Sequence, residues 1–262
     1  MRFSVLTLFP EMFTKVLGES ILGRAAEKGI LQFELVNIRD FSENKHRKVD
    51  DYPYGGGTGL VMGPQPIYDA YQSVANGAKV HTVYMSPQGK VLNQKTARRL
   101  VNLEHLVILC GHYEGVDERV LEEIVDEEIS IGDYVLTGGE IPAMALMDCV
   151  ARMVPGVLPS EEAYQEESHY NGLLEYPHYT RPPEFHGREV PPVLLSGHHN
   201  NISRWRREQS LLRTWLKRPD MLRRFRPEPE DQTFLALLHG KRRKTVEQIE
   251  SGKRVERMKQ DG

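Results

Sequence analysis

"IGDYVLTGGE", residues Ile131 to Glu140, begins like a β-strand and stops at two glycines and an acid. Two earlier strand-like segments also run into small or turn-forming residues, in "YMSPQG" (Tyr84 to Gly89) and "CGHYEG" (Cys110 to Gly115). Glycine carries no Cβ, so such turns let main-chain groups come close to a ligand. One such turn is usually an ordinary strand-to-helix connection, but three in succession, with Glu114 inside one of them, favour a binding site.

Strand-like and helix-like segments alternate around these turns through the first half of the chain. Strands are expected over residues 1–8, 31–38, 78–86, 105–110 and 127–136, and helices over 10–29, 66–76, 92–102, 115–125 and 140–154. This alternation predicts an α/β fold with a mostly parallel sheet covered on both faces. The carboxyl ends of parallel strands lie on one side of a sheet, and ligands of open α/β sheets bind there.

The residue pattern limits the ligand that such a site would hold. The phosphate-binding pattern GxxxxGK[ST] is absent, and "GGGTGLVMG" (Gly55 to Gly63) fails the GxGxxG spacing at Leu60 and Met62. A nucleoside triphosphate or a dinucleotide is therefore not expected. A purine ligand without phosphates, such as S-adenosylmethionine, fits main-chain groups and apolar side chains such as Met85, Ile131 and Leu136.

Length and composition indicate a soluble globular protein of one large or two smaller domains. The chain has 262 residues, of which 39% are hydrophobic and 27% are charged. No run approaches the roughly 20 apolar residues that cross a bilayer, and "MRFSVLTLFPEMF" has no signal-peptide cleavage pattern. Cys110 and Cys149 form no zinc pattern and lie in apolar runs, which predicts buried free thiols in a reducing compartment, the cytoplasm.

Charge is divided unevenly along the chain. Residues 196–262 hold 17 Lys and Arg against 9 Asp and Glu, a net charge of +8, while residues 1–195 carry −11. This division favours a polyanionic partner and a solvated helical surface equally. We expect an α/β domain over residues 1–160, a flexible linker over 161–175, and a basic helical domain over 176–262, with Ile202, Trp205, Leu212 and Leu216 on one stripe of a helix.

Four motifs together resemble one known family. "DDYPYGGGTGLVM" (50–62), "LCGHYEGVDERV" (109–120), "SIGDYVLTGGE" (130–140) and "GLLEYPHYTRP" (172–182) are similar to the bacterial tRNA (guanine-N1)-methyltransferases of the TrmD type, and the similarity runs from about Met1 to Leu238. The resemblance implies a SPOUT-type α/β domain with a deep trefoil knot and a homodimer whose active site is shared between subunits. It also implies methyl transfer from S-adenosylmethionine to N1 of guanosine 37 of tRNA, 3′ of the anticodon. It further suggests that Mg²⁺ assists, although no residue cluster resembles a dedicated metal site.

By the same resemblance, the three turns hold the methyl donor. The implied cofactor-binding residues are Tyr84, Met85, Ser86, Pro87, Gly89, Gly111, His112, Tyr113, Glu114, Gly115, Ile131, Gly132, Tyr134, Leu136, Gly138 and Gly139.

The chemistry requires a base near N1 of guanine and a positive charge near O6. The resemblance implies an acid directly before a serine as the base, which here is Glu167 before Ser168, where the family has Asp. Glu is one methylene longer, so Glu166 is an alternative, and without the resemblance both acids read as solubilising residues of a linker. Arg152 matches the family arginine that stabilises O6, but its position also suits a simple helix C-terminus.

The tRNA contacts are expected mainly on the basic part of the chain. Ser168, His178, Tyr179, Arg181, Arg204 and Arg207 are the candidates there, with Arg206, Arg213, Lys217 and Arg218 as further cations and "GKRRK" (240–244) as a basic tail. Asp50 matches a family acid implicated in tRNA handling and equally suits a turn before Pro53. Two other functions stay open: a related RNA methyltransferase that acts on ribose or another base, and a non-catalytic RNA-binding protein.

Overall fold

The computed structural model describes residues 1–160 and 162–240. The chain divides into two compact units, Met1–Ala163 and Tyr164–Gly262. The division falls inside the 161–175 range of the expected linker. Glu161 and most of the basic tail at 240–244 lie outside the described residues.

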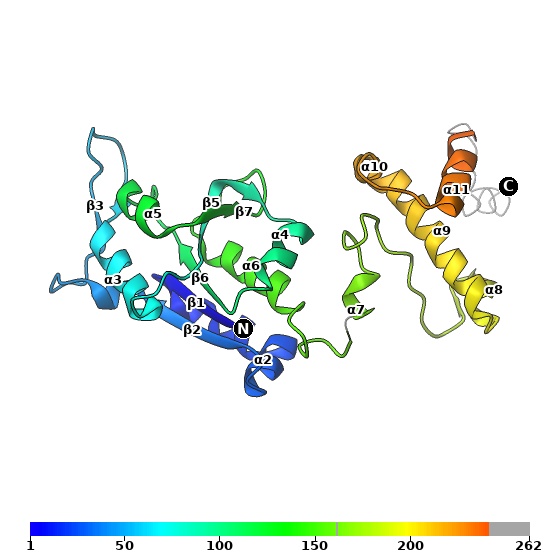
Figure 1. The fold of residues 1–262 in the computed structure, drawn as a ribbon, viewed down its shortest axis with the longest axis horizontal. Helices are drawn as coiled ribbons and strands as arrows, with labels where there is room; N and C mark the ends of the chain where they lie inside the picture. The colour runs from blue at the N-terminus through cyan, green and yellow to red at the C-terminus, as the bar shows by residue number, and fades with distance from the viewer. Residues whose placement is uncertain (161, 241–262) are drawn as a thin grey trace. The chain divides into compact units, whose positions relative to one another are not determined.

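The first unit is built on a five-stranded parallel sheet of order β2-β1-β6-β5-β7 (Figure 1). Its strands are β1 (Arg2–Thr7), β2 (Gln32–Asn37), β5 (Thr82–Val91), β6 (His105–Cys110) and β7 (Glu127–Ser130), and every pairing between neighbours is parallel. The expected mixed α/β architecture is confirmed. Because β5, β6 and β7 are adjacent and parallel, their carboxyl ends lie together.

Helices cover both faces of this sheet. Leu6, Val107 and Leu109 belong to one buried cluster with α3 (Pro64–Ala75) and α5 (Glu118–Ile124). Side chains alternate along a strand, so the buried residues between them face the other side. There α6 (Glu140–Ala151) packs on β1 and β6 and contacts α4 (Gln94–Leu100).

The segment expected to be one helix over residues 10–29 is broken into three. It forms the 3₁₀-helix η1 (Pro10–Met12), α1 (Thr14–Gly18) and α2 (Ser20–Glu27), and a second 3₁₀-helix, η2 (Ile38–Phe41), follows β2. Glu19 is extended and Ser20 has a φ of 55°, so the chain turns between α1 and α2. The prediction of one continuous helix was wrong because Gly18 contributes little helix propensity and hydrophobic spacing does not detect a break of one residue.

The strand expected over residues 127–136 ends at Ser130. The Ser130 hydroxyl donates to the Gly132 carbonyl (2.9 Å) and accepts from the Gly132 N–H (3.1 Å), and Gly132 has a φ of 151°. A serine side chain that bonds to nearby backbone in this way competes with strand pairing. Residues 131–136, which were expected to continue the strand, therefore form a loop.

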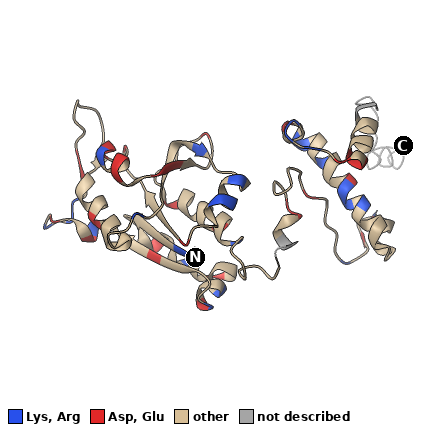
Figure 2. Ribbon diagram, in the orientation of Figure 1, with Lys and Arg blue, Asp and Glu red and all other residues tan. Residues whose placement is uncertain are grey.

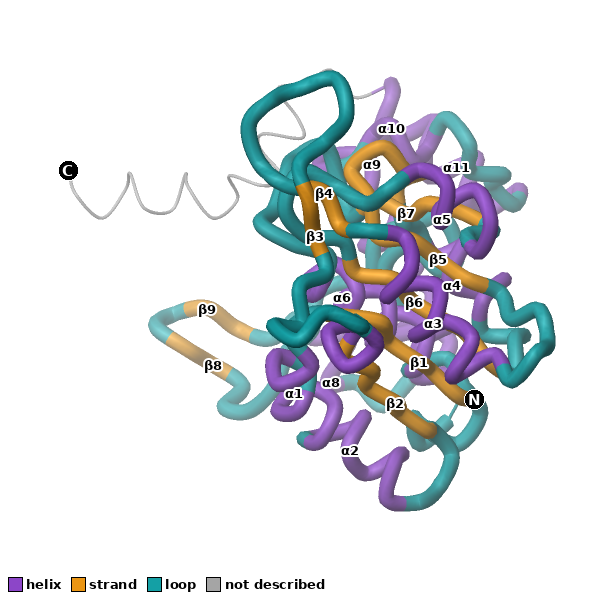
Figure 3. The backbone as a smooth tube through the Cα atoms, turned by 90° about the vertical axis from the view of Figure 1, so that its left-hand side faces the viewer, coloured by secondary structure: helices purple, strands orange, loops and turns teal. Residues whose placement is uncertain are grey.

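Two further features bear on the site. The pairing of β5 with β7 shifts register between Met85 and Lys90, so the "SPQG" turn is a bulge inside a longer strand than expected. The short strands β3 (Asp50–Asp51) and β4 (Val61–Met62) pair antiparallel, and the loop that joins them stands out from the unit (Figures 1 and 3).

The second unit contains mostly helices. The helix α7 (Glu162–Gln165) spans the boundary between the units. The second unit includes the hairpin β8 (Glu184–Phe185) and β9 (Arg188–Glu189), α8 (Pro192–Leu195), α9 (His199–Lys217), α10 (Pro219–Leu222) and α11 (Pro229–Gly240). Lys and Arg residues follow one another along α9 (Figure 2).

The buried residues of α9 are Leu211 and Thr214. The expected apolar stripe of Ile202, Trp205, Leu212 and Leu216 is only half-buried. Thr214 Oγ1 accepts from Leu174 N (2.8 Å) and so holds the preceding segment against the helix. In the part of the chain that the structure describes, no helix is both long and apolar enough to span a membrane.

Candidate functional site

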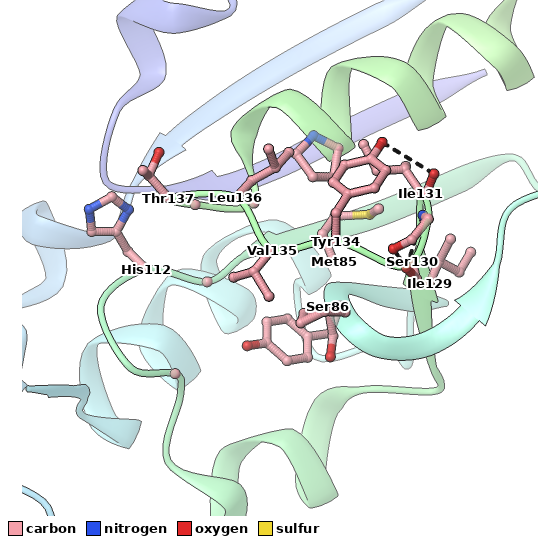
Figure 4. Close-up of a pocket in the computed structure, with 18 of the residues that line it drawn as sticks. Met85, Ser86, His112, Ile129, Ser130, Ile131, Tyr134, Val135, Leu136 and Thr137 are labelled. Atoms are coloured by element: carbon pink, nitrogen blue, oxygen red, sulfur yellow. Dashed lines mark hydrogen bonds between the residues drawn. The ribbon is translucent and has the colours of Figure 1, made fainter. Parts of the chain in front are cut away.

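A cavity of about 150 Å³ lies at the carboxyl ends of β5, β6 and β7 (Figure 4). His112 lies at one end of the site and Ile129 to Ile131 at the other, with Met85, Tyr134 and Leu136 between them. The cavity is lined by Tyr84, Met85, Ser86, Pro87, Gly111, His112, Tyr113, Glu114, Gly115, Ile129, Ser130, Ile131, Gly132, Tyr134, Val135, Leu136, Thr137, Gly138, Gly139 and Pro142. The three turns singled out in the sequence are thus brought together around one space.

The backbones of the turns that follow β6 and β7 are in direct contact. Gly139 N donates to Gly111 O (2.9 Å), and His112 pairs with Gly138 in an isolated antiparallel bridge. A Cβ on Gly139 would lie 2.8 Å from Cys110 Cα, and one on Gly111 would lie 2.7 Å from the Tyr84 hydroxyl. Glycine is required at position 139, where the neighbouring atoms are backbone, whereas a side chain at 111 would displace the Tyr84 ring.

The loop after β7 forms one wall of the cavity. Gly132 adopts a positive φ that favours glycine, Tyr134 N donates to Gly132 O (2.9 Å), and the Tyr134 hydroxyl donates to Ile131 O (3.4 Å; Figure 4). Val135 is 80% exposed and Leu136 is 40% exposed. The loop therefore offers apolar surface and main-chain groups, but few charges, to a bound molecule.

A buried carboxylate lies behind the glycines. Glu140, the first residue of α6, is 2% exposed and accepts a hydrogen bond from Thr7 Oγ1 (2.8 Å). A negative charge is stabilised at a helix N-terminus. Burial, with Glu140 as a lesser cause, raises the pKa of the Cys110 thiol well above its usual range, so Cys110 stays a neutral thiol. Cys110 is a buried free cysteine, as expected, and Cys149 is a half-buried one.

Two polar groups of the cavity have distinctive surroundings. His112 Nδ1 is buried and has no hydrogen-bond partner, while its ring packs 5.0 Å from that of Phe9. Tyr84 is buried, and burial, with smaller effects of Glu128 and Glu118, raises its pKa to about 12. The Tyr84 phenol is neutral at physiological pH, whereas the orphaned nitrogen of His112 has an unmet hydrogen-bonding capacity.

The residues expected to bind the cofactor line this cavity, except for Gly89. A Cβ on Gly89 would lie 2.5 Å from Ile129 N, so this glycine permits the close packing of β5 against β7. Five lining residues had not been expected: Ile129, Ser130, Val135, Thr137 and Pro142. Val135 and Thr137 lie inside the quoted stretch 131–140, and Ile129, Ser130 and Pro142 lie within two residues of its ends.

Arg152 follows α6 as its C-cap and is half-buried in the first unit. Glu166, Glu167 and their neighbours belong to the second unit, where they line a separate cavity of about 220 Å³ with Tyr176, Arg206 and Arg207. Ser168 Oγ accepts from Glu175 N (3.0 Å), which fixes the turn that carries Glu167.

The guanidinium of Arg206 closes one side of this second cavity. It lies 4.8 Å from the centre of the Tyr176 ring, and its buried Nε has no partner. The Tyr176 hydroxyl donates to Glu166 Oε2 (3.1 Å). The cavity thus presents carboxylates, a guanidinium and an aromatic ring, which suit a planar polar molecule.

The expected tRNA-binding residues differ in whether their side chains already have partners within the protein. Arg181 is exposed, Tyr179 lies 6.3 Å from the Trp205 ring, His178 pairs with Glu175 (2.6 Å), and Arg204 pairs with Glu208 (2.9 Å) on the surface of α9. Asp50 forms β3 in the first unit.

Arg207 donates two hydrogen bonds, of 2.9 and 2.8 Å, to the buried Asp231 of α11. Its guanidinium therefore holds two helices together. Among residues 1–160 and 162–240, no group of three or more His, Cys, Asp or Glu side chains is arranged to hold a metal ion.

Comparison with known proteins gives consistent matches along the chain. Residues 1–224 match the family model described as tRNA (Guanine-1)-methyltransferase TrmD. A tRNA (guanine-N(1)-)-methyltransferase of Ruminiclostridium cellulolyticum is 62% identical over 223 residues, which are 84% of this chain and 96% of the relative. Relatives of the same name from Alkaliphilus oremlandii (55% over 249 residues; 92% and 100%) and Clostridioides difficile (54% over 227 residues; 86% and 98%) are also similar.

Proposed function

The chain belongs to the tRNA (guanine-1)-methyltransferase family of the TrmD type, and we propose that it transfers a methyl group from S-adenosylmethionine to N1 of guanosine 37 in tRNA. The observation that carries this proposal is the single cavity formed by three glycine-containing turns at the carboxyl ends of β5, β6 and β7. Family membership identifies the protein as a tRNA methyltransferase, and the cavity offers its methyl donor a place to bind.

The cavity residues fit an adenosyl group. Met85, Ile131 and Leu136 supply apolar walls for a purine, and the glycine-containing turns that line the cavity supply main-chain groups for its polar edge. Glu114, at the rim, suits the amino end of the methionine part. When bound, this donor supplies a methyl group on a positively charged sulfur.

The acceptor nitrogen must lose its proton as the methyl group is transferred. We propose that the carboxylate of Glu167, or of Glu166 beside it, accepts the proton from N1 of guanine. Arg152 would stabilise the negative charge that develops on O6, because a guanidinium remains charged and presents several donors in one plane. The structure holds Glu167 on a turn fixed by Ser168, which supports a defined position for the carboxylate.

The basic second unit is the proposed tRNA-binding part. Arg181 and Arg204 are exposed cations for phosphate contacts, and Tyr179 and His178 offer rings near them. The ion pair with Asp231 leaves Arg207 a mainly structural role. With tRNA as the substrate we place the activity in the cytoplasm, and assistance by Mg²⁺ stays a prediction.

We also propose the trefoil knot and the homodimer with a shared active site that the family implies. The hydrogen bond between Gly139 and Gly111 brings the turns after β6 and β7 into contact, as the crossing loops of a knot would require. Exposed apolar side chains on and near η1, α1, α2 and α6 support a dimer: Phe9, Met12, Val16, Ile21 and Ile141. Sedimentation velocity of a Val16→Asp variant tests it, because a buried charge at an interface would shift a dimer toward monomer.

Methyl transfer from labelled S-adenosylmethionine to an unmodified tRNA transcript tests the activity, with the product nucleoside identified as 1-methylguanosine. A transcript with adenosine at position 37 is the control. Label on a ribose or on another base would assign a different methyltransferase activity, and an absence of label with guanosine at position 37 would refute the proposal.

Three variants test the assigned roles. Glu167→Ala should abolish turnover with nearly unchanged donor affinity in calorimetry, while Glu166→Ala retains turnover. The opposite result moves the base to Glu166. Arg152→Ala should slow single-turnover methyl transfer at least about tenfold, and an unchanged rate would exclude its role at O6.

A further inference from the structure

Two tyrosines stand exposed on the loop between β3 and β4. Tyr54 is 100% exposed and Tyr52 is 77% exposed, and the loop stands out from the rest of its unit (Figures 1 and 3). Placing an aromatic ring fully in water has no benefit for folding, because the ring makes no buried contact. The exposure therefore calls for a partner that covers the rings.

Glycines shape the loop that carries them. Gly55, Gly56, Gly57 and Gly59 all have positive φ, between 81° and 129°, a conformation that other residues rarely adopt. Asp51 Oδ1 accepts from Tyr52 N (2.9 Å), and Asp51 pairs with Val61 across the strands. The two tyrosines lie at the start of this loop, residues 52–60, which we call the arch. Its glycines have no side chains that could cover the rings.

The end of the arch next to β4 is hydrogen-bonded to residues that line the candidate donor cavity. Glu114 N donates to Leu60 O (3.0 Å), and Met62 N donates to Gly115 O (2.9 Å). Gly59 packs so closely on Glu114 that a Cβ there would lie 2.6 Å from its Oε1. Since Glu114 and Gly115 line the cavity, the arch stands at its rim.

Three cations on segments near the arch are paired with acids, which weakens the case for a phosphate site there. Lys48 pairs with Asp51 (3.2 Å), Arg47 with Asp40 (2.9 Å), and Arg119 with Asp117 through bonds of 2.9 and 2.7 Å. Arg119 lies near the Tyr54 hydroxyl: its pKa is raised mainly by Asp117 and slightly by Tyr54. The feature of this loop that stays uncovered is its two exposed aromatic rings, which suit stacking.

We propose that Tyr54, with Tyr52 beside it, stacks on an unpaired nucleobase of the tRNA loop that presents the target guanosine. The inference rests on the proposed function, because a substrate whose base reaches the methyl donor must bring its flanking nucleotides past the rim of the cavity. Every nucleobase has a flat face, so aromatic stacking tolerates any sequence at that position. Tyr54 and Tyr52 are positioning residues for tRNA and take no part in proton or methyl transfer.

Steady-state kinetics of Tyr54→Ala test the proposal. Loss of one base–ring stack should raise KM for tRNA by about 5- to 150-fold with kcat changed less than about twofold. Tyr54→Phe and Tyr54→Trp keep a ring and should restore KM to within about threefold of the wild type. Donor affinity, measured by calorimetry, should stay unchanged in all three variants, and Val91→Ala, at a half-exposed apolar residue outside the arch, is the control.

A double-mutant cycle identifies the nucleotide. An abasic site placed in turn at each unpaired anticodon-loop position beside the target should weaken wild-type binding at one position and have little further effect on Tyr54→Ala. An unchanged KM in Tyr54→Ala, equal losses in Tyr54→Phe and Tyr54→Ala, or additive losses at every abasic site would overturn the inference. So would a lower sedimentation coefficient of Tyr54→Ala, which would assign the rings to a contact between two copies of the chain. Failure of the wild type to methylate tRNA would instead refute the proposed function.

Discussion

Gly139 is the residue at which two walls of the cavity come into direct contact. Its missing Cβ would lie 2.8 Å from Cys110 Cα and 3.0 Å from Gly111 N, and neither backbone atom can move without disturbing β6. Gly139→Ala should therefore lower the free energy of unfolding by about 1–3 kcal/mol, the usual cost of overpacking, and weaken donor binding. Urea denaturation and calorimetry measure the two effects.

Gly18→Ala is the matched control, because a Cβ there meets nothing within 4 Å and the residue lies in α1. Alanine favours helix over glycine, so this variant should be as stable as the wild type or slightly more stable. Equal losses in both variants would show that the contact between Gly139 and Cys110 is not specific.

Tyr84 makes stability sensitive to alkaline pH. Burial, and to a lesser degree Glu128, raises its pKa to about 12, whereas an unfolded tyrosine titrates near pH 10. The contribution is fully present below pH 10 and is lost as the pH rises toward 12, because only the unfolded chain then releases the proton. Over this window the wild type should lose about 2–3 kcal/mol relative to Tyr84→Phe, which has no proton to release.

Urea unfolding of both proteins at pH 9, 10, 11 and 12 covers this window, with Tyr52→Phe, at an exposed ring, as the control. A constant difference between wild type and Tyr84→Phe across that range would mean that the Tyr84 hydroxyl is solvated in the folded protein.

At the scale of elements, α9 and α11 are joined by an ion pair between the half-exposed Arg207 and the buried Asp231. Burial by itself raises the pKa of Asp231, but hydrogen bonds from Arg207 and from Glu228 N outweigh it and lower the pKa below its usual range. This contribution is present above the ordinary Asp pKa and is lost as the pH falls through the lowered value.

Asp231→Asn should therefore destabilise the protein by about 2 kcal/mol at pH 7, less than a fully buried pair would, because Arg207 is 39% exposed. Asp220→Asn, which breaks the exposed pair with Arg218, is the control and should have no measurable effect. The difference between Asp231→Asn and wild type in thermal unfolding should shrink toward pH 3. A constant difference would show that the charge of Asp231 is not what joins the helices.

The sequence predicts best the buried strands that are bounded by turn residues. The strands at 2–7, 32–37 and 105–110 are short apolar runs between turn residues, and the structure places them within one or two residues of expectation. Prediction fails where a single residue decides. The break at Ser20 and the end of β7 at Ser130 depend on one backbone angle and one side-chain hydrogen bond, and neither changes the hydrophobic pattern.

The candidate site shows the same division. Glycines after three predicted parallel strands were enough to bring the turns together, because parallel topology puts their ends on one side. The pattern could not distinguish Gly89, which serves packing, from Gly139, which shapes the cavity, since both are glycines at strand ends. Nor could charge alone show that Arg207 is engaged with Asp231, because that pairing joins residues 24 positions apart.

At the scale of the whole molecule, the two units divide the proposed work. Every strand of the central sheet and every residue of the candidate donor cavity lies in Met1–Ala163, while Glu167 and most of the candidate tRNA contacts lie in Tyr164–Gly262. A domain with its own core and its own site does not need the rest of the chain to fold. Donor binding and methyl transfer should therefore be separable.

A fragment of residues 1–163 should fold and bind S-adenosylhomocysteine, the product of the donor, within about tenfold of the full-length affinity, because its cavity is complete. It should methylate no tRNA, since it lacks Glu166, Glu167 and the basic helix α9. Circular dichroism and calorimetry measure folding and binding, and the full-length Glu167→Ala variant is the matched control, which should bind the same ligand and still bind tRNA. A fragment that folds but binds at least about a hundredfold more weakly would show that the second unit or a partner subunit completes the donor site. Methylation by the fragment would exclude both glutamates as the base.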